Sequence, residues 1–105
     1  MSRKGQIAVI FMSVRTGADA NGYYAAAAAM EARAAAQPGY CGFESARGGD
    51  GFGITVSFWA DDDSAKAWRD DPEHRAIREA GRDRWYSRYE LCVARVERDY
   101  DWVRG

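Results

Sequence analysis

The chain has 105 residues, 47% of them hydrophobic and 13% aromatic, which suits one domain with a single core over residues 1–105. Its 15 basic and 16 acidic residues are mixed along the sequence and give a net charge of −1, which argues against the basic face that nucleic-acid binding requires. The longest apolar run, Tyr23 to Met30, is far shorter than the ~20 residues that span a bilayer, and Met1 to Lys4 show no signal-peptide pattern. We therefore expect a cytoplasmic protein that binds neither nucleic acid nor membranes.

The first predicted strand covers Gln6 to Val14, which is apolar on both alternating faces and therefore typical of a strand covered on both sides. An alanine-rich helix is predicted from Gly22 to Ala36, with Asn21 as its N-cap. The segment Gln37-Pro38-Gly39 ends this helix, because proline disfavours helical geometry in the residue before it.

A β-hairpin follows. Residues Tyr40 to Arg47 alternate in polarity, Gly48 to Gly51 form the turn, and Gly53 to Trp59 alternate again on the way back. The two cysteines, Cys41 and Cys92, lie in predicted strands without the C-x-x-C spacing of a metal or redox site, so we expect buried thiols.

The second helical region is predicted to break in the middle. Asp61 to Asp63 supply an N-cap and negative charge at its start, which explains this acidic run better than a metal site does. Asp71-Pro72 restarts the helix with proline at its favoured first position, and Gly81 is the predicted C′ residue. The last strand is predicted from Tyr89 to Val96.

The order of elements is therefore β-α-β-β-α-β, which predicts an α+β ferredoxin-like split sandwich in which two helices pack on one face of a four-stranded sheet. The first and last strands look apolar on both faces, but the helices cover only one. We therefore expect the other face to be covered by a second copy of the chain, in a homodimer.

Beyond this pattern, the sequence resembles one bacterial branch of the antibiotic biosynthesis monooxygenase (ABM) family. The resemblance is carried by QPGYCGFES (37–45), ITVSFW (54–59), AWR (67–69), PEH (72–74), GRDRWY (81–86) and VARVER (93–98). It implies a homodimer whose sheets pack face to face as a dimeric α/β barrel, with a pocket between the sheet and the helices of each subunit. Some members oxidise polycyclic phenols with O₂ and without metal or flavin, whereas others degrade haem, so the family leaves the chemistry open.

Two residues match the pocket of the cofactor-free, quinone-forming members. Trp59 resembles their tryptophan at the end of the third strand, and Arg78 resembles their arginine on the second helix. Thr55 and Ala65 stand where those members have an asparagine and a tyrosine, so half of the set is missing. A cation and an indole N–H are suitable stabilisers of a phenolate. The alternative is that Trp59 belongs to the core and Arg78 lies on the helix surface.

His74 is the single histidine and the side chain best suited to accept a phenolic proton near pH 7. It precedes Ile77 and Arg78 by one helical turn, so the three side chains can share a face. The alternative is a partly exposed His74 that caps the helix or pairs with Asp70 or Asp71.

The haem-degrading members have a tryptophan that Trp68 resembles, followed nine residues later by the iron-binding histidine. Here that later position is Ile77, and the first-strand asparagine of those members corresponds to about Ile10. His74 could take the ligand's place only if the helix is offset by about one turn. Haem is therefore the alternative cofactor, and none is the leading expectation.

We further expect aromatic and apolar side chains to line the substrate pocket: Phe11, Trp68, Ile77, Trp85 and Tyr86. Trp85 and Tyr86 either cover the pocket mouth or join the helix to the last strand as a structural plug. The leading hypothesis is a cofactor-independent monooxygenase, with no metal site, that acts with O₂ on an aromatic or polyketide-type small molecule. Its catalytic residues are Trp59, His74 and Arg78. The alternatives are a haem-degrading monooxygenase and a non-catalytic small-molecule-binding dimer.

Overall fold

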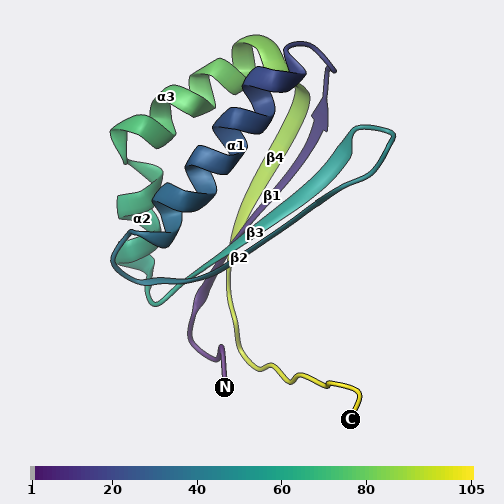
Figure 1. The fold of residues 1–105 in the computed structure, drawn as a ribbon. Helices are drawn as coiled ribbons and strands as arrows, with labels where there is room; N and C mark the ends of the chain where they lie inside the picture. The colour runs from purple at the N-terminus through teal and green to yellow at the C-terminus, as the bar shows by residue number, and fades with distance from the viewer. Residues whose placement is uncertain (1) are drawn as a thin grey trace.

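The predicted order of elements is confirmed by a computed structural model, which describes residues 2–105. The elements are β1 (Ile7–Arg15), α1 (Ala20–Ala35), β2 (Tyr40–Arg47), β3 (Phe52–Trp59), α2 (Asp62–Arg69), α3 (Pro72–Ala80), η1 (Gly81–Trp85) and β4 (Tyr86–Arg95). The strands form one antiparallel sheet in the order β2-β3-β1-β4, and all helices lie on one face of it (Figure 1). This is the α+β ferredoxin-like arrangement.

The sheet register assigns each strand residue to one of two faces. On the helix side, Ile7 lies opposite Trp59, and Phe11 lies opposite Leu91 of β4. The other face is apolar over its two central strands, with Ala8, Ile10, Met12 and Val14 from β1 and Phe52, Ile54, Val56 and Phe58 from β3. We call this second surface the uncovered face. On β4 it carries Arg88 and Glu90, so the expectation that the last strand is apolar on both faces is wrong there.

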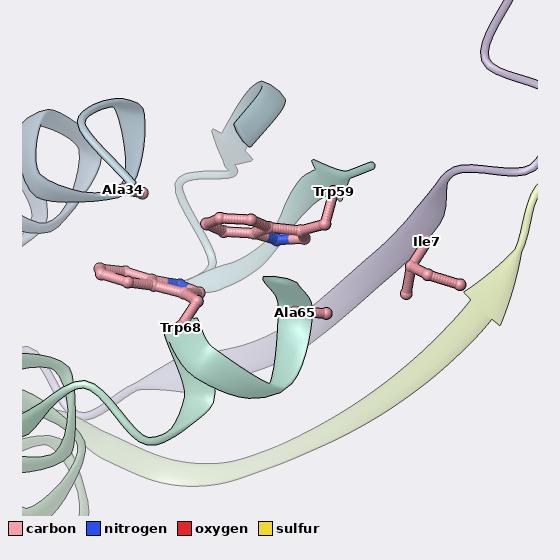
Figure 2. Close-up of a cluster of buried hydrophobic side chains, with 5 residues drawn as sticks. All are labelled: Ile7, Ala34, Trp59, Ala65 and Trp68. Atoms are coloured by element: carbon pink, nitrogen blue, oxygen red, sulfur yellow. The ribbon is translucent and has the colours of Figure 1, made fainter. Parts of the chain in front are cut away.

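The core lies between the sheet and the helices near the start of β1. It consists of Ile7, Ala34, Trp59, Ala65 and Trp68, and the two indole rings lie nearly parallel in Figure 2. Alanines on α1 and α2 leave room for these indoles, which fill most of the core. Removing either indole is therefore expected to cost about 3–5 kcal/mol.

The predicted break in the second helical region is confirmed. Asp61 caps α2 by accepting a hydrogen bond from the backbone N–H of Ser64 at 2.8 Å. Asp71 caps α3 in the same way, accepting from the N–H of His74 at 3.0 Å, and Pro72 occupies the first turn. The two caps fix the change of direction between the helices.

Two helix ends differ from the prediction. The N-cap of α1 is Asp19 and not Asn21, because Asp19 adopts a left-handed conformation (φ 50°) and its side chain accepts from the N–H of Gly22. Gly81 directly follows α3, but its φ of −61° is helical and the chain continues through the wide turn η1, so it is not the C′ residue that was predicted. A Cβ on Gly81 would lie 2.7 Å from the ring of Tyr86, so glycine is needed there for close approach.

The last strand begins at Tyr86, three residues earlier than predicted, and the first strand runs one residue later than predicted. The expectation of two buried thiols is wrong, because Cys92 is exposed on the uncovered face and Cys41 is half-buried. In the part of the chain that the structure describes, no helix is long and apolar enough to cross a membrane.

Candidate active site

Three aromatic rings are stacked where β3, α2 and α3 meet. The ring centroids of Trp59 and Trp68 are 5.9 Å apart with 24° between their planes, and those of Trp68 and His74 are 4.2 Å apart with 12°. Trp59 is fully buried and Trp68 nearly so, whereas His74 is half-buried. The stack therefore leads from the core to the partly exposed imidazole.

Trp59 is a core residue. Its indole N–H donates to the hydroxyl oxygen of Ser57 at 2.9 Å, and the edge of its ring meets Tyr40 with centroids 5.9 Å apart. A buried N–H that already has an acceptor is poorly placed to stabilise a substrate oxyanion. In this structure Trp59 acts on the site by supporting Trp68.

The imidazole of His74 has a defined orientation. Its Nδ1 lies 2.9 Å from the backbone carbonyl oxygen of Trp68, and because a carbonyl only accepts, Nδ1 carries the hydrogen. The lone pair is therefore on Nε2, for which the structure gives no hydrogen bond among the described residues. This is the tautomer that a general base requires.

Burial lowers the pKa of His74 from its ordinary value of 6.5. The hydrogen bond to the Trp68 carbonyl opposes this change, and the positive charge of Arg78 lowers the pKa further. The ring is therefore neutral at pH 7 and able to accept a proton.

Arg78 lies one turn after His74 and ties α3 to the end of α2. One of its terminal N–H groups donates to the carbonyl oxygen of Arg69 at 2.6 Å. Arg78 and its neighbour Ile77 are both half-buried. This hydrogen bond uses one of the five N–H donors of the guanidinium, so other donors are available for a ligand.

A second aromatic group lies at the other end of β1. The ring centroid of Phe11 is 5.4 Å from that of Tyr86 and 5.1 Å from that of Tyr89. Tyr86 is half-buried, and burial raises its pKa above the ordinary value of 10.0. Tyr86 and Tyr89 also line a surface hollow of about 440 Å³, together with Arg82, Ser87 and Arg88.

Trp85 serves as a structural plug. Its side chain is 4% exposed, and its indole N–H donates to a carboxylate oxygen of Asp19 at 3.1 Å. Its ring also meets Tyr23, with centroids 6.0 Å apart. Trp85 therefore connects η1 to the start of α1.

The predicted site residues thus form two groups, which β1 connects along its helix side. Val9 packs against the core that contains the tryptophans, and Phe11 packs on the tyrosines. Opposite these two residues on β4 lie Val93 and Leu91, which are 55% and 52% exposed, and α3 packs mainly on η1 and α2. The candidate active site therefore has two parts, which are this open apolar strip and the aromatic stack that ends at His74.

Three residues that line this part of the sheet were not among the pocket residues predicted from the sequence: Tyr89, Leu91 and Val93. Their alternation along the last strand was a usable signal, because residues two apart share a face. No group of three or more potential metal ligands is present within residues 2–105.

With this geometry established, comparison with known proteins identifies the family. Residues 6–80 match the sequence model of the antibiotic biosynthesis monooxygenase family, and the chain belongs to that family. Over 91 residues it is 48% identical to the uncharacterized protein YqjZ of Bacillus subtilis (strain 168). The aligned residues make up 87% of this chain and 79% of that protein.

Solved structures share the fold. SnoaB of Streptomyces nogalater, described as a cofactor-independent oxygenase, superposes with a TM-score of 0.75 at 19% identity, covering 88% of this chain and 93% of SnoaB. A conserved protein of Methanosarcina mazei Go1 gives a TM-score of 0.79 at 9% identity, covering 89% and 94% of the two chains. At these identities the likeness establishes the fold and not the reaction.

Proposed function

We propose that this protein is a cofactor-independent monooxygenase that oxidises a phenolic aromatic or polyketide-type small molecule with O₂. The observation that carries the proposal is the orientation of His74, whose Nδ1–H is held by the Trp68 carbonyl so that Nε2 is free to accept a proton. Membership of the monooxygenase family and the likeness to SnoaB support the reaction class.

In the proposed reaction, Nε2 of His74 removes the phenolic proton, because a phenolate gives up an electron far more readily than a phenol. The phenolate transfers one electron to O₂, and the resulting carbon radical and superoxide combine to form a C–O bond. The peroxide takes up the proton held by His74, and the resulting hydroperoxide loses its outer oxygen as water, together with the hydrogen of the ring carbon, to give the quinone. One oxygen atom enters the product and the other leaves in water, so that ArH(OH) + O₂ gives a quinone and H₂O without an added reductant.

Arg78 is assigned the role of holding the developing oxyanion through its remaining N–H donors. Trp68 orients His74 by its carbonyl and by the stacked ring, and Trp59 supports Trp68. The apolar side chains of Phe11 and Ile77 are assigned to the substrate rings, together with Leu91 and Val93.

We also propose that the protein works as a homodimer, with residues 1–105 as one domain. The support is the apolar surface of β1 and β3 on the uncovered face, where Ile54 is 40% and Phe52 36% exposed. Packing two such faces around a two-fold axis would give the dimeric α/β barrel and bury them both.

The test is oxygen uptake with a panel of polycyclic phenols and hydroquinones, comparing wild type with His74→Gln. Glutamine can still donate to the Trp68 carbonyl but cannot act as a base at neutral pH, so kcat should fall by about 10²–10⁴. The matched control is Arg75→Gln, which changes the next, exposed residue of α3 and should retain full activity. Full turnover in His74→Gln would exclude the proposed base, and a ligand that stabilises the wild type without oxygen uptake would favour the non-catalytic binding dimer.

A second candidate function is haem binding, and the same imidazole favours it. Histidines that bind metals usually donate their other ring N–H to a carbonyl or carboxylate, as His74 does. Hemin titration by visible absorbance distinguishes the two functions: a saturable Soret band that is lost in His74→Ala would favour haem.

A further inference from the structure

Away from His74, two arginines meet where β1, β2 and the start of α1 come together. Arg47 donates from one terminal nitrogen to the carbonyl oxygens of Ser13, at 3.1 Å, and of Gly51, and from the other to the hydroxyls of Ser13 and Tyr23, at 2.8 and 3.1 Å. Its guanidinium lies against Gly53, where a Cβ would be 2.7 Å from Cζ. Glycine at this position thus makes room for the charged group.

Arg15 approaches the same tyrosine from β1. Its Cζ lies 3.8 Å from the ring centroid of Tyr23, and the Cζ of Arg47 lies 5.5 Å from that centroid. One terminal nitrogen of Arg15 donates to the carbonyl oxygen of Ala18 at 3.2 Å. Its Nε is buried and has no hydrogen-bond partner. We call Arg15 and Arg47 the arginine pair.

The arginine pair has no carboxylate partner among the described residues. Every acceptor that the structure gives it is a neutral carbonyl or hydroxyl oxygen, and neither arginine takes part in a salt bridge. The carboxylate of Asp19, near Arg15 in the sequence, is engaged by Trp85 and lies 3.9 Å from Arg84. Two like charges that share one aromatic ring repel each other, and an unpartnered buried donor is unfavourable.

We propose that the arginine pair is a binding site for a small organic carboxylate, separate from the site at His74. A carboxylate would supply both the missing negative charge and the acceptor for Nε of Arg15, and it matches the planar donor set of a guanidinium.

The surroundings indicate a carboxylate with an apolar body. Tyr23 provides one ring beside both arginines, and the neighbouring Tyr24 is 63% exposed. Tyr24 adds a second ring 5.8 Å from Cζ of Arg15. An aromatic ring would pack on the exposed ring of Tyr24 while its carboxylate meets Arg15.

The experiment measures the melting temperature of the full chain with benzoate, with benzamide as the neutral compound of the same shape, and with inorganic phosphate. At ten times its dissociation constant, benzoate should raise Tm by about 5 °C. Benzamide and phosphate should leave Tm unchanged. Absence of a benzoate shift, or an equal shift with benzamide, would overturn the proposal; stabilisation by phosphate alone would overturn the assignment to a carboxylate.

Arg15→Met should weaken benzoate binding at least tenfold, whereas Arg75→Met on the exposed side of α3 should not. Retained binding in Arg15→Met would contradict the assignment, and if that variant does not fold, the comparison of benzoate with benzamide in the wild type decides. Sedimentation with and without benzoate must also show that the Tm shift is not caused by a change in association. A shift that appears only together with such a change would also count against the site.

Discussion

The chemistry of the candidate active site depends on how one imidazole is held. His74 is fixed by the stacked ring of Trp68, by the carbonyl of the same residue at Nδ1, and by the bond from its backbone N–H to Asp71. The sequence could single out His74 because it is the only histidine. It could not predict the tautomer, since the contact with Trp68 exists only after the break between α2 and α3 has turned the chain.

The lowered pKa of His74 predicts a pH dependence of stability. Because the folded state binds the proton less readily than the unfolded state, the free energy of unfolding should rise with pH between the folded-state pKa and 6.5, and level off above 6.5. Urea denaturation between pH 4.5 and 8 measures it. In His74→Gln this rise should disappear; a slope that persists unchanged in the variant would show that another group causes it.

At the scale of elements, the ion pair between Arg33 and Asp71 joins α1 to the start of α3. Nε and a terminal nitrogen of Arg33 lie 2.7 and 2.8 Å from the two carboxylate oxygens of Asp71, which is 9% exposed. The sequence indicated Asp71 as a helix cap but did not indicate Arg33 as its partner, because β2, β3 and α2 separate the two residues along the chain.

Asp71→Asn should lower the melting temperature by several degrees, because it removes the charge that Arg33 faces and weakens the cap of α3. The hydrogen bond from Arg33 lowers the pKa of Asp71 from 3.8 to about 2. The contribution of this carboxylate is therefore complete above about pH 4 and is lost as the pH falls toward 2. Thermal unfolding at pH 7 and pH 2.5 tests this, with the exposed Asp101→Asn as control. Equal melting temperatures for Asp71→Asn and wild type at pH 7 would contradict it.

Gly81→Ala tests the close approach between η1 and β4. Alanine is the better helix former, but its Cβ would lie 2.7 Å from the ring of Tyr86, so we expect a net loss of about 1 kcal/mol in unfolding free energy. Gly49→Ala is the matched control, because no atom lies within 4 Å of the added Cβ. If Gly81→Ala were the more stable of the two, Tyr86 would not be packed as described.

At the scale of the molecule, the polarity pattern was sufficient to predict the order of elements along the chain, and Asp71-Pro72 was sufficient to predict the helix break, because these signals are local. The two helix ends that differ from the sequence prediction depend on tertiary contacts. Asp19 replaces Asn21 as the cap because its carboxylate also accepts from Trp85, and Gly81 is required by Tyr86 and not by a helix end. The open strip at Leu91 and Val93 likewise depends on where α3 packs.

The proposed dimer predicts a sedimentation mass of two chains at micromolar concentration. Ile54→Lys places a charge on the uncovered face and should shift the protein toward one chain, because burying an unpaired ammonium is unfavourable. The control Ala27→Lys changes an exposed position of α1 and should leave the mass at two chains. A wild-type mass of one chain would contradict the proposed dimeric barrel.

The most direct test of the proposed monooxygenase is an ¹⁸O₂ experiment on purified protein with a phenol from the oxygen-uptake panel. The proposed reaction predicts one labelled oxygen atom in the quinone and one in water, without added metal, flavin or reductant, and a loss of this product in His74→Gln but not in Arg75→Gln. An unlabelled product, or labelled product formed equally by His74→Gln, would contradict the proposed mechanism.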